Sequence, residues 1–269
     1  MAEWVAGDVH ASGIKIHYTR TGGELPALVL AHGITDNGLC WSRVARALEA
    51  EYDIVMYDAR GHGLSDAPEQ GYTLADQVGD LLGLVQGLGL EKPALMGHSM
   101  GALTVLGFAG RYPDLLGKAI LEDPPDPPVL VDQETVEKDL AGRRVLWMTG
   151  LRAYQERTLS ELLAEGRAIT PPWHEDEVRP WAESKLQASL NIANAGEGLC
   201  LPTIDTLSQV TCPVLLLTGD PSAGSRLTPD VAQAMTGLIP SLRLVHFPNT
   251  GHNIRREQFE RFVQEVRRF

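Results

Sequence analysis

Short apolar runs alternate with longer amphipathic segments along most of the chain, and this alternation restricts the fold more than any other feature of the sequence. Continuous apolar runs of about four to six residues are typical of strands buried on both faces, as in a parallel sheet. Such runs lie within residues 26–33, 52–61, 92–101, 117–125, 212–220 and 242–252, and helical periodicity is found at 74–90 and 253–269. The pattern predicts an α/β fold with a doubly wound, mostly parallel sheet. An antiparallel hairpin of residues 5–10 and 14–20 is expected at one edge.

The alternation stops at the segment "LEDPPDPPVL", whose prolines cannot continue a helix. Residues 129–208 then have helical periodicity but no convincing strand. We expect them to form a helical cap, inserted over the carboxyl edge of the sheet, where open α/β sheets bind ligands. Residues 1–128 and 209–269 form the predicted core. The aromatic side chains of the cap predict an apolar substrate pocket that includes Trp147 and Trp173.

Composition excludes several classes of partner. The formal net charge of −12 argues against nucleic acid, whose phosphates would be repelled. No run approaches the roughly 20 apolar residues of a membrane span, and the N-terminus does not resemble a signal peptide, so a cytoplasmic location is the default expectation. The cysteines are odd in number, widely spaced and without a CxxC pair, which favours buried thiols over disulfides or a metal site: Cys40, Cys200 and Cys212. The oligomeric state cannot be inferred from these features.

The segment "LMGHSMGALTV" places Ser99 between a predicted strand and a predicted helix, with Gly97 and Gly101 two residues to either side. A turn this sharp strains the backbone, and glycines remove collisions with neighbouring side chains. Such a turn exposes the serine hydroxyl at the sheet edge and at the positive end of a helix. The pattern G-x-S-x-G is weak alone, but this context predicts that Ser99 is a nucleophile.

A serine nucleophile needs a base to take its proton. His252 follows the last predicted strand in "FPNTGHNI", within a loop that can reach the serine, and is the expected base. His98 adjoins the nucleophile, but its side chain is expected to point away and to serve packing. His62 and His32 are expected to hold their own loops in place.

Charge that develops on a carbonyl oxygen during acyl transfer needs preorganised donors. The turn "HGIT" follows the predicted strand at residues 26–31 and presents the backbone N–H of Ile34. The N–H of Met100 opens the helix after Ser99. Together these two groups are the predicted oxyanion hole.

Four motifs occur in a fixed order: "HGITDNG", "YDARGHGLSD", "GHSMG" and a C-terminal "GH". In this order they resemble the α/β-hydrolase superfamily, and the resemblance spans most of the chain outside residues 129–208. It implies a Ser–acid–His hydrolase that needs no cofactor and no metal, with a helical cap. It does not name a substrate, because this fold supports many chemistries.

The acid is where the sequence departs from the superfamily. The usual acid lies three residues past the glycine of "CPVLLLTG", and that position is Ser222 here. Asp220 directly follows that glycine, while Asp123 ends the preceding sheet strand, where some lactonase-like and dehalogenase-like members place their acid. Glu122 is expected to face the opposite side of the sheet. We expect Asp123 to be the acid, with Asp220 as the alternative.

Hydrolysis of a carboxylic ester through an acyl-enzyme is the first hypothesis for the reaction, with a small-molecule ester or lactone as the partner. A lactonase and a carbon–carbon bond hydrolase use the same triad and remain alternatives. Halide displacement and epoxide opening in this fold need an Asp nucleophile, so Ser99 disfavours both. A small-molecule receptor of hydrolase fold is the alternative from a different class.

Overall fold

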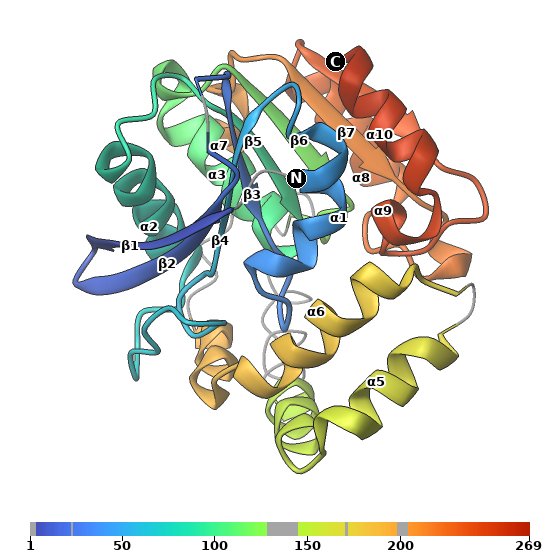
Figure 1. Ribbon diagram of the computed structural model, residues 1–269. Helices are drawn as coiled ribbons and strands as arrows, with labels where there is room; N and C mark the ends of the chain where they lie inside the picture. The colour runs from blue at the N-terminus through green and yellow to red at the C-terminus, as the bar shows by residue number, and fades with distance from the viewer. Residues whose placement is uncertain (1–3, 23, 128–144, 170–171, 198–203) are drawn as a thin grey trace.

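An eight-stranded, mostly parallel sheet forms the centre of the computed structural model, which describes residues 4–22, 24–127, 145–169, 172–197 and 204–269 (Figure 1). The strands are β1 (Val5–Ala11), β2 (Ile14–Arg20), β3 (Ala27–Ala31), β4 (Asp53–Tyr57), β5 (Ala94–His98), β6 (Lys118–Glu122), β7 (Val214–Thr218) and β8 (Leu242–His246). Their order across the sheet is β1-β2-β4-β3-β5-β6-β7-β8. The β1–β2 and β2–β4 pairings are antiparallel and the others are parallel. The predicted fold class and edge hairpin are confirmed.

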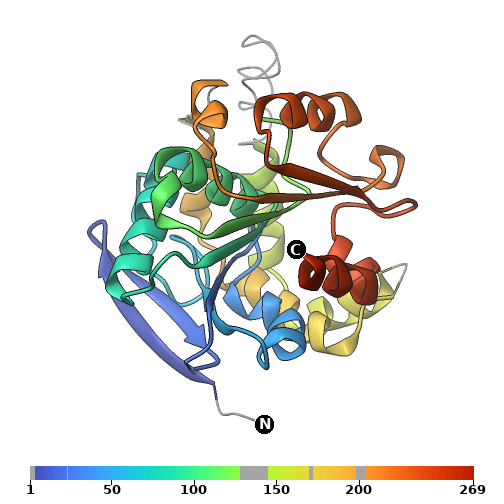
Figure 2. The same ribbon diagram turned by 90° about the horizontal axis from the view of Figure 1, so that it is seen from above.

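Helices cover both faces of the sheet (Figure 2). One face packs against α2 (Leu74–Gly87), α3 (Met100–Arg111) and α8 (Pro229–Leu238), and the other against α1 (Ser42–Leu48) and α10 (Phe259–Arg268). Every residue of β4, β5 and β7 is buried, which explains why these strands are continuous apolar runs rather than alternating ones. Short 3-10 helices occur at η1 (Gly38–Trp41), η2 (Pro113–Leu115) and η5 (Pro221–Ala223).

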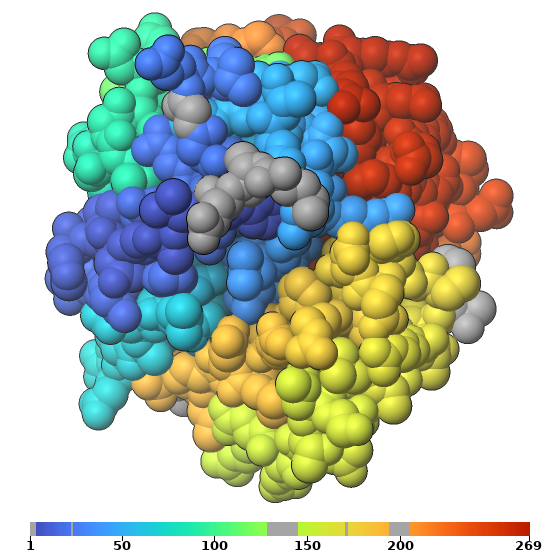
Figure 3. Space-filling model, viewed as in Figure 1, coloured from blue at the N-terminus to red at the C-terminus, as the bar shows by residue number. Residues whose placement is uncertain are grey.

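The helical insertion lies across one end of the sheet, at the bottom of Figure 1, and forms a block beside the core in the space-filling view of Figure 3. Its described elements are a helix over residues 145–155, α5 (Leu159–Ala168), α6 (Glu175–Gln187), η4 (Leu190–Glu197) and α7 (Ile204–Ser208). The last of these packs on the core, since Leu207 joins the hydrophobic cluster that contains α3. Residues 129–144, with which the predicted cap begins, and Cys200 lie outside the described residues.

The C-terminal segment differs from the single helix that its periodicity predicts. It divides into α9 (Ile254–Glu257) and α10, because Gln258 leaves helical geometry with φ −131° and ψ 55°. The side-chain Nε2–H of Gln258 donates to the carbonyl oxygen of Pro248 at 2.9 Å, while its backbone N–H still bonds to Ile254. The break orients α9 independently of α10, so that Arg255 and Arg256 both lie buried beneath the insertion.

The described helices are too short or too polar for any of them to cross a membrane. Two of the cysteines, Cys40 and Cys212, are buried free thiols, as expected from the sequence. Burial raises the pKa of each to about 11, so both thiols stay protonated at neutral pH.

Candidate active site

Ser99 occupies a strained turn between β5 and α3. Its φ of 54° and ψ of −116° lie in a region that L-residues rarely adopt. A Cβ atom at Gly97 would lie 2.2 Å from the carbonyl oxygen of Gly101, and one at Gly101 would lie 2.2 Å from that of Ala31. Both contacts are impossible, so the turn requires glycine at these two positions. The backbone is thus shaped around the serine, as the sequence motif predicts.

The structure brings His252 together with Asp123. Nδ1 of His252 lies 2.6 Å from Oδ2 of Asp123, whose side chain is fully buried at the end of β6. The loop after β7 supplies two further donors to this carboxylate, the hydroxyl of Ser225 at 2.5 Å and the backbone N–H of Arg226 at 2.8 Å. In the superfamily pattern this loop usually supplies the acid; here it donates two hydrogen bonds to a carboxylate at the end of the neighbouring strand, the predicted acid.

Asp220 has different partners. Its carboxylate lies 3.0 Å from Nε2 of His246 and accepts the N–H of Asn249 at 2.5 Å. It is therefore engaged in holding the loop that follows β8. Of the two acids considered from the sequence, only Asp123 contacts His252.

His98 has a place in the site that the sequence did not predict. Its Nε2–H donates to the carbonyl oxygen of His252 at 2.9 Å, and the two imidazole rings lie 4.6 Å apart. Burial, with Arg255 and His252 as further causes, holds the pKa of His98 well below its usual range, so its ring stays neutral. The sequence does show a histidine directly before the predicted nucleophile, and this was the signal that could have pointed to a role for His98. Its contact with His252 could not be predicted, because only the fold brings these two residues together.

The two N–H groups of the predicted oxyanion hole belong to Ile34 and Met100. Neither the N–H of Ile34 nor that of Met100 has a hydrogen-bond acceptor among the described residues. The turn of Ile34 adjoins the nucleophile, because a Cβ atom at Gly33 would lie 3.4 Å from Cβ of Ser99. His32 supports this turn, with Nδ1 2.8 Å from the carbonyl oxygen of Gly33. The geometry is compatible with the predicted oxyanion hole.

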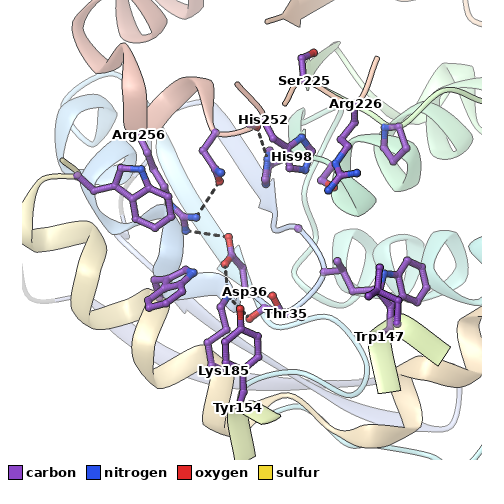
Figure 4. A pocket seen from close by; sticks show the side chains of 18 residues that line it. Thr35, Asp36, His98, Trp147, Tyr154, Lys185, Ser225, Arg226, His252 and Arg256 are labelled. Atoms are coloured by element: carbon purple, nitrogen blue, oxygen red, sulfur yellow. Dashed lines mark hydrogen bonds and ion pairs between the residues drawn. The ribbon is translucent and has the colours of Figure 1, made fainter. Parts of the chain in front are cut away.

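Ser99 and His252 line a cavity of about 490 Å³ between the sheet edge and the insertion. The insertion contributes aromatic side chains from Trp147, Tyr154, Trp173 and Trp181. The cavity is nevertheless more polar than the aromatic residues of the sequence suggested. Its lining also includes charged side chains: Asp36, Lys185, Arg226 and Arg256 (Figure 4).

A buried network of charges joins the core to α6, and three of its members also line the cavity. Asp36 contacts Lys185 at 3.1 Å, Arg255 at 3.2 Å and Arg256 at 2.9 Å. Glu122 pairs with Arg255 at 2.9 Å, and Glu177 with Arg256 at 3.3 Å. Burial opposes ionisation of Asp36, but the three cations outweigh it and hold the pKa of Asp36 well below its usual range. Three carboxylates thus face three cations.

Arg226 stands apart from this network. Its backbone N–H is bound to Asp123, but its guanidinium has no hydrogen bond or ion pair within the described residues. In Figure 4 the side chain extends toward the middle of the cavity and no dashed line joins it to another residue.

Within the described residues, no group of three or more His, Cys, Asp or Glu side chains could hold a metal ion.

A strained serine, a histidine and a buried aspartate at the carboxyl edge of a parallel sheet are the groups of a serine hydrolase. The model of the alpha/beta hydrolase fold family matches residues 26–255, and the chain belongs to this family.

Two relatives with named activities are similar to this chain in sequence. The chain is 31% identical over 246 residues to 2-(acetamidomethylene)succinate hydrolase of Mesorhizobium japonicum, covering 87% of this chain and 84% of that one. It is 39% identical over 127 residues to N-formylmaleamate deformylase of Pseudomonas putida, covering 46% and 47% of the two chains. A crystal structure of E-2-(acetamidomethylene)succinate hydrolase superposes with a TM-score of 0.83 at 24% identity and covers 99% of each chain. This last likeness shows the fold.

Proposed function

We propose that the protein hydrolyses the acyl–nitrogen or acyl–oxygen bond of a small molecule that carries a carboxylate. Ser99 attacks the acyl carbon while His252 takes its proton, and the charge that develops on the acyl oxygen is stabilised by the N–H groups of Ile34 and Met100. The bond from the acyl carbon to nitrogen or oxygen then breaks, and His252 returns the proton to the leaving group. Water, activated by His252, releases the acyl group from Ser99 as a carboxylic acid.

The observation on which the proposal depends is the guanidinium of Arg226, which has no hydrogen-bond or ion-pair partner in the part of the chain that the structure describes. The buried charge network pairs its own members, because the cations at 185, 255 and 256 face the carboxylates at 36, 122 and 177. The guanidinium of Arg226 lies outside this network and has no counter-ion among the described residues. A guanidinium binds a carboxylate with two parallel hydrogen bonds, so an anionic substrate fits this cavity better than a neutral ester.

The names of the two relatives support the same substrate class. Acetamidomethylene succinate and N-formylmaleamate each combine an N-acyl group with carboxylate. We extend this combination to the present chain and favour an N-acyl substrate over the simple ester that the sequence suggested first. Ester and amide hydrolysis use the same nucleophile, base and oxyanion donors, so the difference lies in the leaving group.

The test compares two esters of similar acyl length that differ mainly in the charge at the end of the acyl chain. 4-Nitrophenyl hydrogen succinate and 4-nitrophenyl pentanoate have similar acyl chains, ending in a carboxylate and a methyl group. We expect kcat/KM to favour the succinate ester, and N-formyl and N-acetyl amides with a nearby carboxylate to be hydrolysed more slowly by the same site. Lactones and diketones are tested in parallel, because lactone hydrolysis and carbon–carbon bond hydrolysis are the alternative reactions for the same triad.

Arg226→Gln is the matched variant, because it removes the charge and retains the backbone N–H that binds Asp123. We expect KM for the succinate ester to rise about 10- to 100-fold, the effect of losing a charged hydrogen bond of about 1.5–3 kcal/mol. The pentanoate ester should change less than about twofold. A preference for the neutral ester, or an equal loss for both esters, would refute the anionic substrate class.

A further inference from the structure

Lys185 is a buried cation that the cap contributes to the core. It lies on α6 at the same face as Glu177 and Trp181, which come eight and four residues earlier, and its side chain is 3% exposed. Nζ donates to the carbonyl oxygen of Thr35 at 2.9 Å, to the hydroxyl of Thr35 at 3.0 Å and to Oδ1 of Asp36 at 3.1 Å. An ammonium has three N–H donors, so these acceptors use all of them. Lys185 thus lines the cavity without a donor left for a substrate.

The turn that Lys185 binds is strained. Thr35 has a φ of 68°, in the left-handed region that a β-branched residue avoids. The turn is closed by the hydrogen bond from the N–H of Asp36 to the carbonyl oxygen of Gly33 at 3.1 Å. Strain of this kind persists only where the surroundings fix it, and here Lys185 binds both polar groups that Thr35 offers it. The residue held between Gly33 and Thr35 is Ile34.

We propose that Lys185 is a positioning residue for the oxyanion hole: by binding Thr35 and Asp36 from the cap, it fixes the turn that aims the Ile34 N–H at the acyl oxygen. The inference rests on the proposed function, because an oxyanion hole has meaning only for acyl transfer. It makes the cap a part of the catalytic apparatus rather than only a cover for the substrate.

Two other contacts show that α6 is fixed to the same region of the core. Oε1 of Gln187 accepts the amide N–H of Asn37 at 2.8 Å, next to the turn. Glu177, at the other end of the helix, pairs with Arg256. The helix is therefore attached on both sides of Lys185, and Lys185 holds a constant position relative to the turn.

The expected effect follows from the place of Lys185 in the reaction. Loss of one oxyanion donor lowers kcat about 10²- to 10³-fold, and a donor that is displaced rather than removed costs less. We expect Lys185→Met to lower kcat about 10- to 100-fold. KM should stay within about threefold, because Lys185 has no donor for the substrate. Methionine keeps much of the length of the side chain, and Asp36 keeps its two arginine partners.

The experiment measures turnover of 4-nitrophenyl acetate and the rate at which a fluorophosphonate labels the protein, since its phosphoryl oxygen occupies the same hole. Neither probe contains a carboxylate, so the substrate class in the proposed function does not affect the result. Lys185→Met should slow both rates, and Lys185→Arg, which keeps the charge, should recover part of the loss. Arg179→Met is the control, because this cation lies exposed on the same helix; it should behave as wild type.

Wild-type rates in a Lys185→Met variant that melts at the wild-type temperature would overturn the proposal. So would a rise in KM at unchanged kcat, which would make Lys185 a substrate ligand. If Lys185→Met does not fold, Thr35→Gly tests the same idea, because glycine tolerates the left-handed φ and releases the turn. Undiminished kcat in Thr35→Gly then contradicts it. The proposed function is tested separately: it fails if Arg226→Gln leaves the preference for the succinate ester over the pentanoate ester unchanged.

Discussion

The hydrogen bond from Nε2–H of His98 to the carbonyl oxygen of His252, at 2.9 Å, joins the residue before Ser99, the predicted nucleophile, to the histidine that is its predicted base. The two imidazole rings also lie in tilted contact, with their centroids 4.6 Å apart. His252 is thus held from two sides, by Asp123 at its Nδ1 and by His98 at its backbone carbonyl oxygen. Fixed geometry of this kind is what converts a bound substrate into a reactive one.

We predict that His98→Phe lowers kcat about 10- to 100-fold, the loss expected when a catalytic group is displaced by about 1 Å. Phenylalanine keeps the ring packing but leaves the His252 carbonyl oxygen without its donor. KM should change little, because the hydrogen bond does not involve substrate. Steady-state kinetics beside a melting curve test this; unchanged kcat in a folded variant would show that Asp123 alone is sufficient to hold the base.

The acid is tested by two matched substitutions. Asp123→Asn should lower kcat about 10⁴-fold, the effect that the same change has in a serine-protease triad, because asparagine favours the wrong imidazole tautomer. Asp220→Asn should cost about tenfold or less, through the loop that it shares with His246 and Asn249.

Both aspartate variants must first melt like wild type, since Asp123 is buried among hydrogen bonds that also stabilise the fold. A severe loss in Asp220→Asn with near-normal Asp123→Asn would contradict the pairing seen here. The usual arrangement of the superfamily would then apply.

The cap aromatics are expected to set the choice of substrate. Trp147 and Trp173 line the cavity, and the ring of Trp173 also covers the guanidinium of Arg256 at 4.5 Å. Trp147→Ala and Trp173→Ala should change the ranking of acyl groups by kcat/KM more than the maximal rate on the best one. The ranking is measured with a series of esters that each carry a free carboxylate and differ in the length of the acyl chain. Equal loss across the series would mean that the tryptophans have only a structural role.

Stability is predicted to fall in acid because of His62. Burial is the largest cause that lowers the pKa of His62 to about 3, whereas an unfolded histidine titrates near about 6.5. Between these values the unfolded chain binds one more proton than the folded one. The free energy of unfolding therefore decreases by about 1.4 kcal/mol per pH unit as the pH falls below 6.5, and this dependence is absent above about pH 7.

Urea unfolding at pH 7.5, 6.0 and 5.0 measures the slope, and His62→Phe provides the control. Nε2 of His62 has no partner in the described structure, so phenylalanine loses only the Nδ1 hydrogen bond to the carbonyl oxygen of Arg60. The slope of the variant should be smaller by about 1.4 kcal/mol per pH unit. Equal slopes in the two proteins would mean that His62 also titrates near its ordinary value when folded.

Much of the fold and part of the site could be predicted from the sequence. Buried parallel strands are continuous apolar runs, and the strained serine requires glycines at two fixed positions. Both features can therefore be recognised from short stretches of the sequence. The pairing of His252 with Asp123 rather than Asp220 also follows from where strands end. The catalytic roles of these residues stay predictions until the variants are measured.

The charge network was not predictable in the same way, because its members come from distant parts of the chain and charged residues are normally exposed. Two local signals existed. Glu177 and Lys185 share a helical face with Trp181, which a solvent-exposed face would not favour. Arg255 and Arg256 begin a helix, where the dipole disfavours positive charge, and so indicate buried partners. Neither signal identifies the partner, which only the fold brings into contact.

Intact-mass spectrometry of the protein after incubation with a fluorophosphonate tests the central claim, that Ser99 is the nucleophile, most directly. The wild-type protein should gain the mass of one phosphonyl adduct and lose turnover of 4-nitrophenyl hydrogen succinate in proportion. Ser99→Ala should fold as wild type, stay unlabelled and lose turnover by about 10³-fold or more. A single adduct that persists in Ser99→Ala would contradict the assignment.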